Sequence, residues 1–269
     1  MNQLPLAESN ISSVYQKNYD CHKDQVQDLL DEVYQYIDPT SRYMHRLRIN
    51  LFYDLMKKLI ADKTIKKFEK ALDIGCNCGF YSKLLSDMGF KSVRGIDIDT
   101  PLLKRANEFF KSDVKAGKVK YENINAEELP DEQFDFILCT EVIEHTQNPQ
   151  KVINYIKRNL SPGGIALITL PNVLSYSFFL TWLSYKLHRR KIDGELKDHL
   201  KYPSFRAVSL FKDPSIEIVT TSGTNLFHWY FLQKVPGFKF LSRLNFELSR
   251  IKPINYFSQF FFIVIRKSE

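Results

Sequence analysis

Two glycines and three polar residues stand where the sequence predicts that strands end. In the segment LDIGCNCGF (residues 72–80), Gly75 lets the chain turn sharply after an apolar strand, and Gly79 lets a helix start close to a ligand. Asp73 is an acid that suits the ammonium group of a ligand. Asp97 ends the next predicted strand, where an acid in doubly wound sheets receives two ribose hydroxyls. Asn125 follows the third strand, where its amide can face the edge of a base.

The spacing of the two glycines is GxxxG, which differs from the GxGxxG of dinucleotide sites. A pyrophosphate needs a glycine cradle at a helix N-terminus, so the predicted ligand is a nucleoside without a pyrophosphate. Each of these residues alone could be an ordinary tight turn or a strand-end acid. Their order and spacing together favour a ligand site.

A second polar group follows the fourth predicted strand, in the segment CTEVIEH (residues 139–145). Glu141, Glu144 and His145 share a face if Glu141 begins a helical turn, because residues i, i+3 and i+4 lie on one side of a helix. In one mechanism, His145 or a later histidine takes the proton of a hydroxyl as a general base. In the other, a divalent cation lowers the pKa of the hydroxyl. Its candidate ligands are Glu141, Glu144, His145 and the distant His199.

Both mechanisms stay open, with Glu141 at the reaction centre in either. We favour the route without a metal, and His145 ahead of His199, because His145 lies at a strand end beside the nucleoside site.

A frame for these residues follows from the alternation of strands and helices. Strands are predicted at 71–74, 93–98, 119–124, 134–139, 165–170, 216–220 and 260–266, and helices at 22–37, 40–61, 80–88, 100–114 and 149–160. Thr100 and Asn148, each followed by proline, are the predicted N-caps, and the segment 161–164 (SPGG) is a predicted stop. The pattern predicts an α/β fold with a doubly wound, mostly parallel seven-stranded sheet, N-terminal helices and a helical lid insertion.

The 269 residues suit one large domain. We expect four parts: an N-terminal helical cap (1–68), a cofactor-binding core (69–171), a lid insertion (172–210), and C-terminal strands with an acceptor-side segment (211–269). Residues 172–269 carry 15 Lys and Arg against 7 Asp and Glu, which places acceptor recognition late in the chain. The apolar stretch 173–187 predicts either a lid helix on the sheet or a helix lying on a membrane surface.

The cysteines and the apolar segments indicate in which cellular compartment the protein works. Cys21, Cys76, Cys78 and Cys139 are too few for a disulfide framework, and a CxC pair without a second pair does not complete a zinc site. No signal peptide or membrane span is visible. We therefore expect a cytoplasmic protein, with peripheral contact at the inner face of the membrane as an open possibility.

The segments LDIGCNCG, GIDID, CTEVIEH and LSPGGIALITLPN resemble the class I S-adenosylmethionine-dependent methyltransferases, and most of all the ubiquinone-biosynthesis O-methyltransferase type. The resemblance is good over residues 71–172 and loose elsewhere. It implies that S-adenosylmethionine is the cofactor and that Asp73, Gly75, Gly79, Asp97 and Asn125 bind it, although the last position is often aspartate in the family. We place the neighbouring Cys76, Ile98, Ala126 and Thr140 at the cofactor as well.

In the ubiquinone-type enzymes an HRxN segment supplies an arginine to the methionine carboxylate. Here the segment HRLRIN (residues 45–50) has one additional residue, so Arg46 is our first candidate and Arg48 the second. A solvated basic helix face is the alternative for either arginine.

The resemblance implies methyl transfer to a hydroxyl of a glycan, a lipid-linked sugar or a quinone-like phenol. The acceptor is then a small molecule or a lipid-linked one. ExxEH followed by a later histidine is similar to the small-RNA 3′-end methyltransferases, so RNA methylation is one alternative. An inactive cofactor-binding scaffold is another. The sequence shows no recognisable RNA-binding module, and we expect no nucleic-acid partner.

Overall fold

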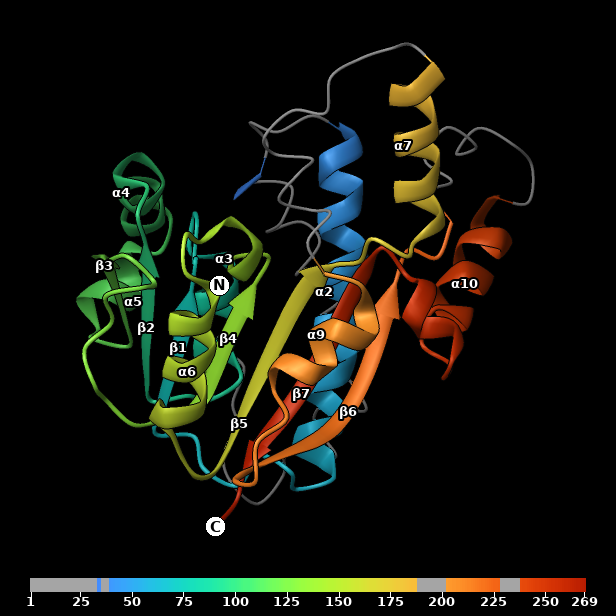
Figure 1. Ribbon diagram of the computed structural model, residues 1–269. Helices are drawn as coiled ribbons and strands as arrows, with labels where there is room; N and C mark the ends of the chain where they lie inside the picture. The colour runs from blue at the N-terminus through green and yellow to red at the C-terminus, as the bar shows by residue number, and fades with distance from the viewer. Residues whose placement is uncertain (1–32, 35–38, 188–201, 228–237) are drawn as a thin grey trace.

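The computed structural model describes residues 33–34, 39–187, 202–227 and 238–269 (Figure 1). Seven strands form one sheet in the order β3-β2-β1-β4-β5-β7-β6. They are β1 (Lys70–Ile74), β2 (Ser92–Asp97), β3 (Val119–Asn123), β4 (Phe134–Thr140), β5 (Leu160–Pro171), β6 (Ile216–Thr224) and β7 (Phe260–Lys267). Strand β7 runs antiparallel to β5 and β6, and the other neighbours are parallel. The predicted seven-stranded, mostly parallel fold is confirmed.

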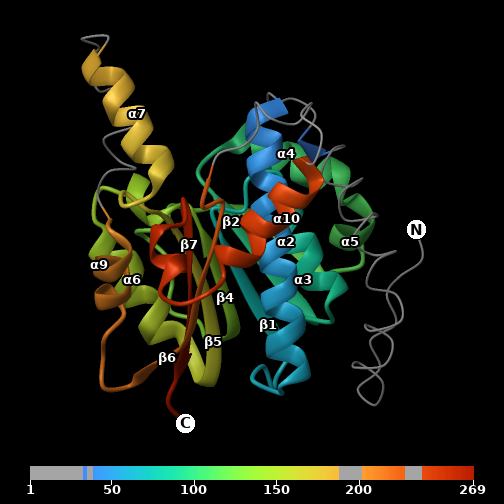
Figure 2. The same cartoon turned by 90° about the vertical axis from the view of Figure 1, so that its right-hand side faces the viewer.

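Helices cover both faces of this sheet. They are α2 (Pro39–Ala61), α3 (Phe80–Asp87), α4 (Thr100–Phe109), α5 (Lys111–Lys115), α6 (Pro149–Asn159), α7 (Tyr176–Leu187), α9 (Ser204–Leu210) and α10 (Phe238–Leu248), with 3₁₀ turns at η1 (Ile143–His145) and η3 (Ile254–Phe257). Figure 2 views the sheet nearly along its edge, with α2 and α3 on one side and α6 and α9 on the other.

The alternation of side chains along the strands builds a separate core on each face. In β5, Ile165 and Leu167 belong to the cluster that contains the apolar residues of α2 and α3. Ala166 and Ile168 belong to the cluster under α6 and α9. Because α2 shares its core with the sheet, the predicted N-terminal cap is, in its described part, a layer of the same domain.

Local signals place most element boundaries within a few residues, with three differences. The N-cap of α4 is Asp99, whose side chain accepts from the N–H of Leu102, rather than the predicted Thr100. The predicted helix 100–114 is two helices that meet at Phe110. The predicted stop at 161–164 lies inside β5, which begins at Leu160 and shifts its register against β4.

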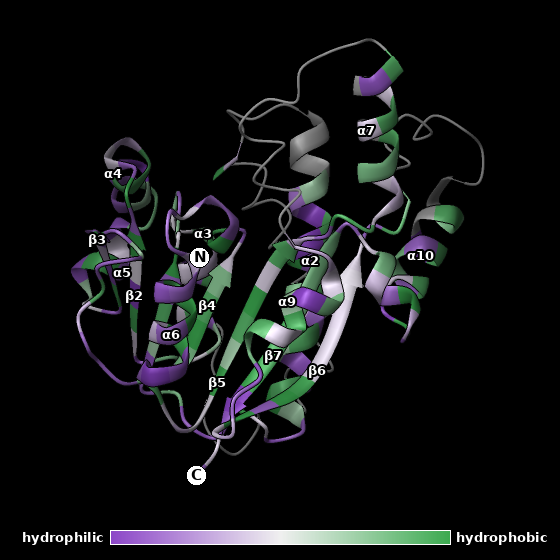
Figure 3. Cartoon of the chain, in the orientation of Figure 1, coloured by the Kyte–Doolittle hydropathy of each residue, from purple (hydrophilic) through white to green (hydrophobic). Residues whose placement is uncertain are grey.

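Helix α7 occupies the predicted lid insertion and stands out from the carboxyl end of the sheet in both views (Figures 1 and 2). The hydropathy colouring in Figure 3 shows hydrophobic residues along α7 as well as in the buried central strands. Phe178 at its base is buried, whereas Phe179 and Trp182 are 55% and 41% exposed. Among the described residues, no helix combines the length and the apolar character needed to cross a bilayer.

Asn172 fixes the base of α7. Its amide nitrogen donates to the carbonyls of Tyr256 (2.7 Å) and Ser258 (2.9 Å), and its oxygen accepts from the N–H groups of Leu174 (3.2 Å) and Ser204 (3.0 Å). Two donor bonds and two acceptor bonds fill the capacity of this side chain. One buried amide therefore joins the starts of α7 and α9 to the segment before β7.

Candidate cofactor and acceptor site

A cleft of about 740 Å³ opens at the carboxyl ends of the parallel strands. This is the edge at which doubly wound sheets bind ligands. Nine of the residues predicted from the sequence line it: Gly75, Cys76, Asp97, Ile98, Asn125, Ala126, Thr140, Glu141 and His145. Four others do not line it: Arg46, Asp73, Gly79 and Glu144. The predicted His199 lies outside the described residues, as does most of the predicted helix 22–37.

The turn after β1 has no room for side chains at its two glycines. Gly75 (φ 72°) and Gly79 (φ 79°) adopt the left-handed conformation that favours glycine. A Cβ on Gly75 would lie 2.3 Å from Cγ2 of Val142, and one on Gly79 would lie 2.4 Å from the hydroxyl oxygen of Tyr121. The backbone of Gly75 therefore borders the cleft without a side chain.

Asp73 lies behind this turn and is fully buried. Its Oδ2 accepts from the Ser82 hydroxyl at 2.7 Å, and its Oδ1 has no hydrogen-bond partner among the described residues. Burial, with a smaller contribution from the charge of Asp97, raises the pKa of Asp73 to about 7. The predicted direct contact with a ligand's ammonium group is not what this geometry provides, because the carboxyl supports the turn from inside.

Asp97 is oriented from behind by two backbone amides. Its Oδ2 accepts from the N–H of Asn77 at 2.8 Å, and its Oδ1 accepts from the N–H of Asp99 at 2.9 Å. Each carboxylate oxygen keeps further capacity as an acceptor. A pair of neighbouring hydroxyls, as on a ribose, fits this arrangement. Ile98 beside it is 72% exposed at the cleft rim and offers apolar surface to a base.

The loop after β3 forms another wall of the cleft. Asn125 lines the cleft, and its Oδ1 accepts one bond, from the N–H of Glu127 at 2.9 Å, so its amide nitrogen and one lone pair of Oδ1 are left for a ligand. Glu127 in turn accepts from the N–H groups of Gln147 (2.6 Å) and Asn148 (3.1 Å). These bonds tie the loop to the N-terminus of α6 and fix the width of the cleft.

Glu141 lines the cleft just after β4. Its backbone is in the left-handed region (φ 54°), which is uncommon for a residue with a side chain. Its Oε1 accepts from the hydroxyl of Thr169 at 2.8 Å, and its Oε2 lies 4.0 Å from Nη1 of Arg48. Burial raises the pKa of the Glu141 carboxyl, and the nearby guanidinium opposes that rise. Strained, buried acids of this kind cluster at functional sites.

The three residues of the ExxEH segment do not share one face. The 3₁₀ turn begins at Ile143 rather than at Glu141, so the left-handed residue separates Glu141 from the turn. Glu144 is completely buried, and its Oε1 lies 3.8 Å from Nε2 of His145. The side chain of His145 is 42% exposed and lines the cleft. Within the described ranges, no group of three His, Cys, Asp or Glu residues is placed to hold a metal ion.

The structure places Arg48, the second candidate, on the cleft in place of Arg46. His45, Tyr34 and Tyr81 also line the cleft, and the sequence analysis did not select them. The helical spacing of the HRLRIN segment could have indicated His45 and Arg48 together. On a helix, residues 45 and 48 share a face, whereas residue 46 points about 100° away.

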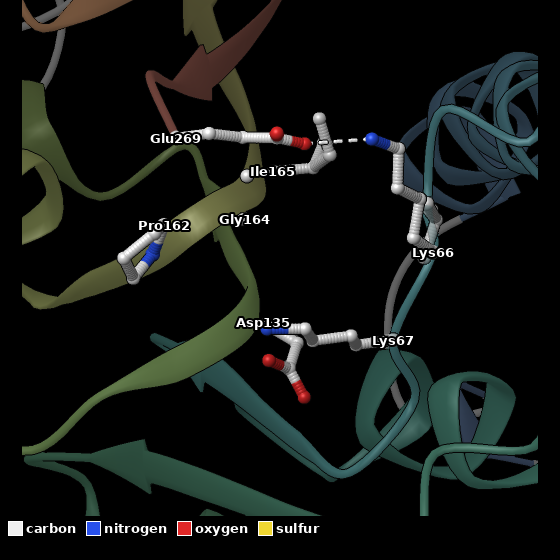
Figure 4. Close-up of a pocket in the computed structure, with 9 residues that line it drawn as sticks. Lys66, Lys67, Asp135, Pro162, Gly164, Ile165 and Glu269 are labelled. Atoms are coloured by element: carbon white, nitrogen blue, oxygen red, sulfur yellow. Dashed lines mark hydrogen bonds and ion pairs between the residues drawn. The ribbon is translucent and has the colours of Figure 1, made fainter.

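A second cavity lies at the opposite, amino edge of the sheet (Figure 4). It measures about 250 Å³, and Lys66, Lys67, Asp135 and Glu269 are among its lining residues. Lys66 and Glu269 form an exposed ion pair at 2.7 Å. None of the predicted site residues lies there.

The fold and the cleft together fit the class of the S-adenosylmethionine-dependent methyltransferases. The glycine turn, the oriented Asp97 and the absence of room for a side chain at Gly75 fit a nucleoside ligand without a pyrophosphate. Residues 72–168 match the family described as a methyltransferase domain. Over these residues the chain is similar to methyltransferase domains, and the predicted resemblance is confirmed.

Relatives of known name agree with this class. A ubiquinone biosynthesis O-methyltransferase from Psychrobacter arcticus is 30% identical over 139 residues, which are 50% of this chain and 53% of the relative. One from Rickettsia typhi is 28% identical over 80% of this chain and 81% of its own length. A tRNA U34 carboxymethyltransferase from Campylobacter hominis is 38% identical over 36% of this chain and 34% of its own. The chain spans about half the length of the first curated relatives that it matches.

Solved structures show the same fold. A methyltransferase from Aquifex aeolicus superposes with a TM-score of 0.52 at 15% identity, over 88% of this chain and 98% of its own. A protein from Pyrococcus horikoshii gives a TM-score of 0.54 at 18% identity, over 84% and 91%.

Proposed function

We propose that this protein transfers the methyl group of S-adenosylmethionine to a hydroxyl oxygen of a small or lipid-linked acceptor. One observation supports the proposal above the others: a single cleft has Gly75 and Asp97 on one side and Glu141 and His145 on the other. The cofactor, when bound, supplies an electrophilic methyl group on a sulfonium. The names of the ubiquinone-type relatives favour oxygen as the methyl acceptor. A glycan, a lipid-linked sugar and a quinone-like phenol all offer such a hydroxyl.

The residues divide the work of binding. Asp97 receives the ribose hydroxyls with the two oxygens that Asn77 and Asp99 orient. The base lies between Ile98, Ala126 and the amide nitrogen of Asn125. The bare backbone at Gly75 and Cys76, with Thr140 opposite, contacts the amino-acid part. Arg48 takes its carboxylate, and Asp73 and Gly79 hold the turn from behind.

The acceptor hydroxyl loses its proton during the transfer. His145 is the side chain best placed to take it, because its imidazole lines the cleft and is 42% exposed. Glu141 offers Oε2 as a hydrogen-bond acceptor that aligns the hydroxyl, while Thr169 holds its other oxygen. This route needs no metal. In the alternative route a cation binds Glu141, Glu144, His145 and His199, and the described positions of the first three do not converge on one point.

The test measures transfer of a labelled methyl group to phenols, sugar nucleotides, lipid-linked sugars and small RNAs. We expect a phenol or sugar hydroxyl to be methylated with EDTA present, and His145→Ala to lower kcat by about 100-fold or more. Gln147→Ala, which also alters a cleft residue but removes no titratable group, serves as the matched control. Loss of activity in EDTA and recovery with Mg²⁺, Mn²⁺ or Zn²⁺ would favour the metal route. Methylation of RNA alone would favour the RNA alternative, and cofactor binding without methyl transfer to any acceptor would favour the inactive scaffold.

We further propose that α7 docks on an anionic membrane surface and brings the cleft to a lipid-linked acceptor. Phe179, Trp182 and Leu187 on this helix are 55%, 41% and 72% exposed. The segment 173–191 contains no acid, and it ends in the sequence HRRK. Lys186 lies 5.0 Å from the ring of Trp182, which places a cation beside an exposed indole. Apolar side chains next to basic ones are what interfacial helices present to lipid headgroups.

Sedimentation with lipid vesicles tests this docking. We expect binding to vesicles that contain phosphatidylglycerol and weak binding to neutral phosphatidylcholine. Replacing Phe179 and Trp182 together by serine should abolish the binding. Phe205→Ser is the matched control, because this phenylalanine is 62% exposed on α9, outside the proposed surface. Equal binding by both variants, or equal loss, would contradict the assignment of α7.

A further inference from the structure

The guanidinium of Arg48 is held by groups from three different elements. From α2, Nδ1 and Nε2 of His45 lie 2.8 Å and 3.3 Å from Nη2. After β4, Oε2 of Glu141 lies 4.0 Å from Nη1. From β7, the ring of Phe260 lies 4.8 Å from the guanidinium carbon. The side chain of Arg48 is 13% exposed and lines the cleft, and its Nε has no partner among the described residues. The arginine is thus fixed at the cleft with hydrogen-bonding capacity left for a ligand.

His45 is electrically neutral in this position. Burial, together with the positive charge of Arg48, lowers the pKa of His45 to about 2. A neutral imidazole has one nitrogen that accepts a hydrogen bond. Since Arg48 can only donate, the ring nitrogen without a hydrogen is the acceptor, and Nδ1 is nearer to Nη2 (2.8 Å) than Nε2 is (3.3 Å). So weakly basic an imidazole is unsuited to take a proton from the acceptor, although His45 also lines the cleft.

Tyr34 limits how the imidazole can turn. Its ring stacks on His45 with 4.6 Å between centroids and 20° between planes, and it lines the cleft as well. A ring fixed on its face keeps its nitrogens next to the arginine. Arginine is a long side chain with many rotamers, and ordering it before the ligand arrives lowers the entropic cost of binding.

We infer that His45 is a positioning residue, a neutral hydrogen-bond acceptor that presents the guanidinium of Arg48 to the carboxylate of the cofactor's amino-acid part. The inference rests on the proposed function, in which Arg48 binds that carboxylate. A planar guanidinium recognises a carboxylate through two parallel bonds, so its orientation decides how well it binds. Glu141 approaches Nη1 and the ring of Phe260 lies by the guanidinium carbon, whereas His45 is the neighbour of Nη2.

Two ligands distinguish a role of His45 in orienting Arg48 from a general structural role. S-adenosylhomocysteine carries the amino-acid part, whereas 5′-methylthioadenosine has the same adenosine and thioether without it. Two variants separate the properties of the imidazole. His45→Phe keeps a ring to stack on Tyr34 and loses the acceptor, and His45→Asn loses the ring and keeps an acceptor oxygen near the place of Nδ1. Arg48→Ala is the reference for complete loss of the carboxylate contact.

Calorimetry should show that His45→Phe raises the Kd of S-adenosylhomocysteine about tenfold, or about 1.4 kcal/mol, with the Kd of 5′-methylthioadenosine unchanged. His45→Asn should bind both ligands nearly as the wild type does. Equal weakening of both ligands by His45→Phe would show a structural role and overturn the inference, and so would unchanged binding of both. If Arg48→Ala leaves both Kd values unchanged, Arg48 does not bind the carboxylate and the inference fails with it. A wild type that binds neither ligand would overturn the proposed function itself.

Discussion

Replacing Asp97 by alanine tests the nucleoside half of the cleft most directly. The carboxylate accepts one backbone N–H on each oxygen, from Asn77 at 2.8 Å and from Asp99 at 2.9 Å. These bonds aim the remaining lone pairs into the cleft before any ligand arrives. Each ribose hydroxyl then gains a charged acceptor without reorganisation of the site.

The magnitude follows from the two bonds that are lost. A hydrogen bond to a charged group contributes about 1.5–3 kcal/mol. Water that enters the truncated site restores part of this loss. We therefore take the free energy of one such bond as the smallest expected loss of binding. We therefore expect Asp97→Ala to weaken S-adenosylhomocysteine binding by more than about tenfold, or about 1.4 kcal/mol. Asp97→Asn should lose nearly as much, because its amide group turns a donor toward one of the two backbone N–H groups.

The assay is calorimetry on the wild type and Asp97→Ala with S-adenosylhomocysteine and its 2′-deoxy analogue. The analogue should bind the wild type more weakly, and Asp97→Ala should lose most of that discrimination. Asp99→Ala is the matched control: this residue caps α4 by accepting from Leu102 at 3.0 Å and does not line the cleft. It should lower the free energy of unfolding by about 1 kcal/mol and leave the affinity unchanged. Equal discrimination by the wild type and Asp97→Ala would refute a direct contact with the ribose.

Three further predictions concern the turn after β1 and the base of α7. Gly75→Ala should destabilise the fold more than Gly117→Ala does in chemical denaturation, because both have positive φ but only the Gly75 methyl meets a neighbour, Val142 at 2.3 Å. Addition of Val142→Ala should recover part of the difference. The pKa of Asp73, raised by burial to about 7, means that the folded chain holds more protons than the unfolded one above about pH 4. The free energy of unfolding should therefore fall as pH rises from about 4 to 7, and Asp73→Asn should flatten this dependence; an unchanged slope would contradict it. Asn172→Ala should cost about 2 kcal/mol or more in thermal or urea unfolding, because it leaves buried backbone groups without partners, and a loss within 0.5 kcal/mol would contradict that account.

Local rules were enough for the sheet and for most of the cofactor side. Apolar runs separated by amphipathic helices determine a parallel α/β sheet, since only such a sheet buries both faces of its strands. The ends of those strands are then neighbours at one edge, whatever the details of packing. For this reason Gly75, Asp97, Ile98, Asn125 and Thr140 were placed correctly on the cleft from their positions along the chain.

The acceptor side depended on contacts between segments distant in sequence. Nothing local indicates that Glu141 adopts φ 54°, because that conformation is held by bonds to Thr169, 28 residues further along the chain. The same unforeseen backbone turned Glu144 into the core and left His145 on the cleft.

The choice between Arg46 and Arg48 was likewise tertiary. Both arginines lie on α2, and the sequence alone does not say which face of that helix meets the sheet. Packing of the α2 core against β5 and β7 sets the rotation of the helix, and that rotation brings His45 and Arg48 to the cleft. The sequence by itself determined the class of the fold and the edge of the sheet at which the cleft lies, because both follow from strand order and strand ends. Only the tertiary structure decided which side chains of α2 and of the segment after β4 line the cleft, because their directions depend on long-range packing and on one strained residue.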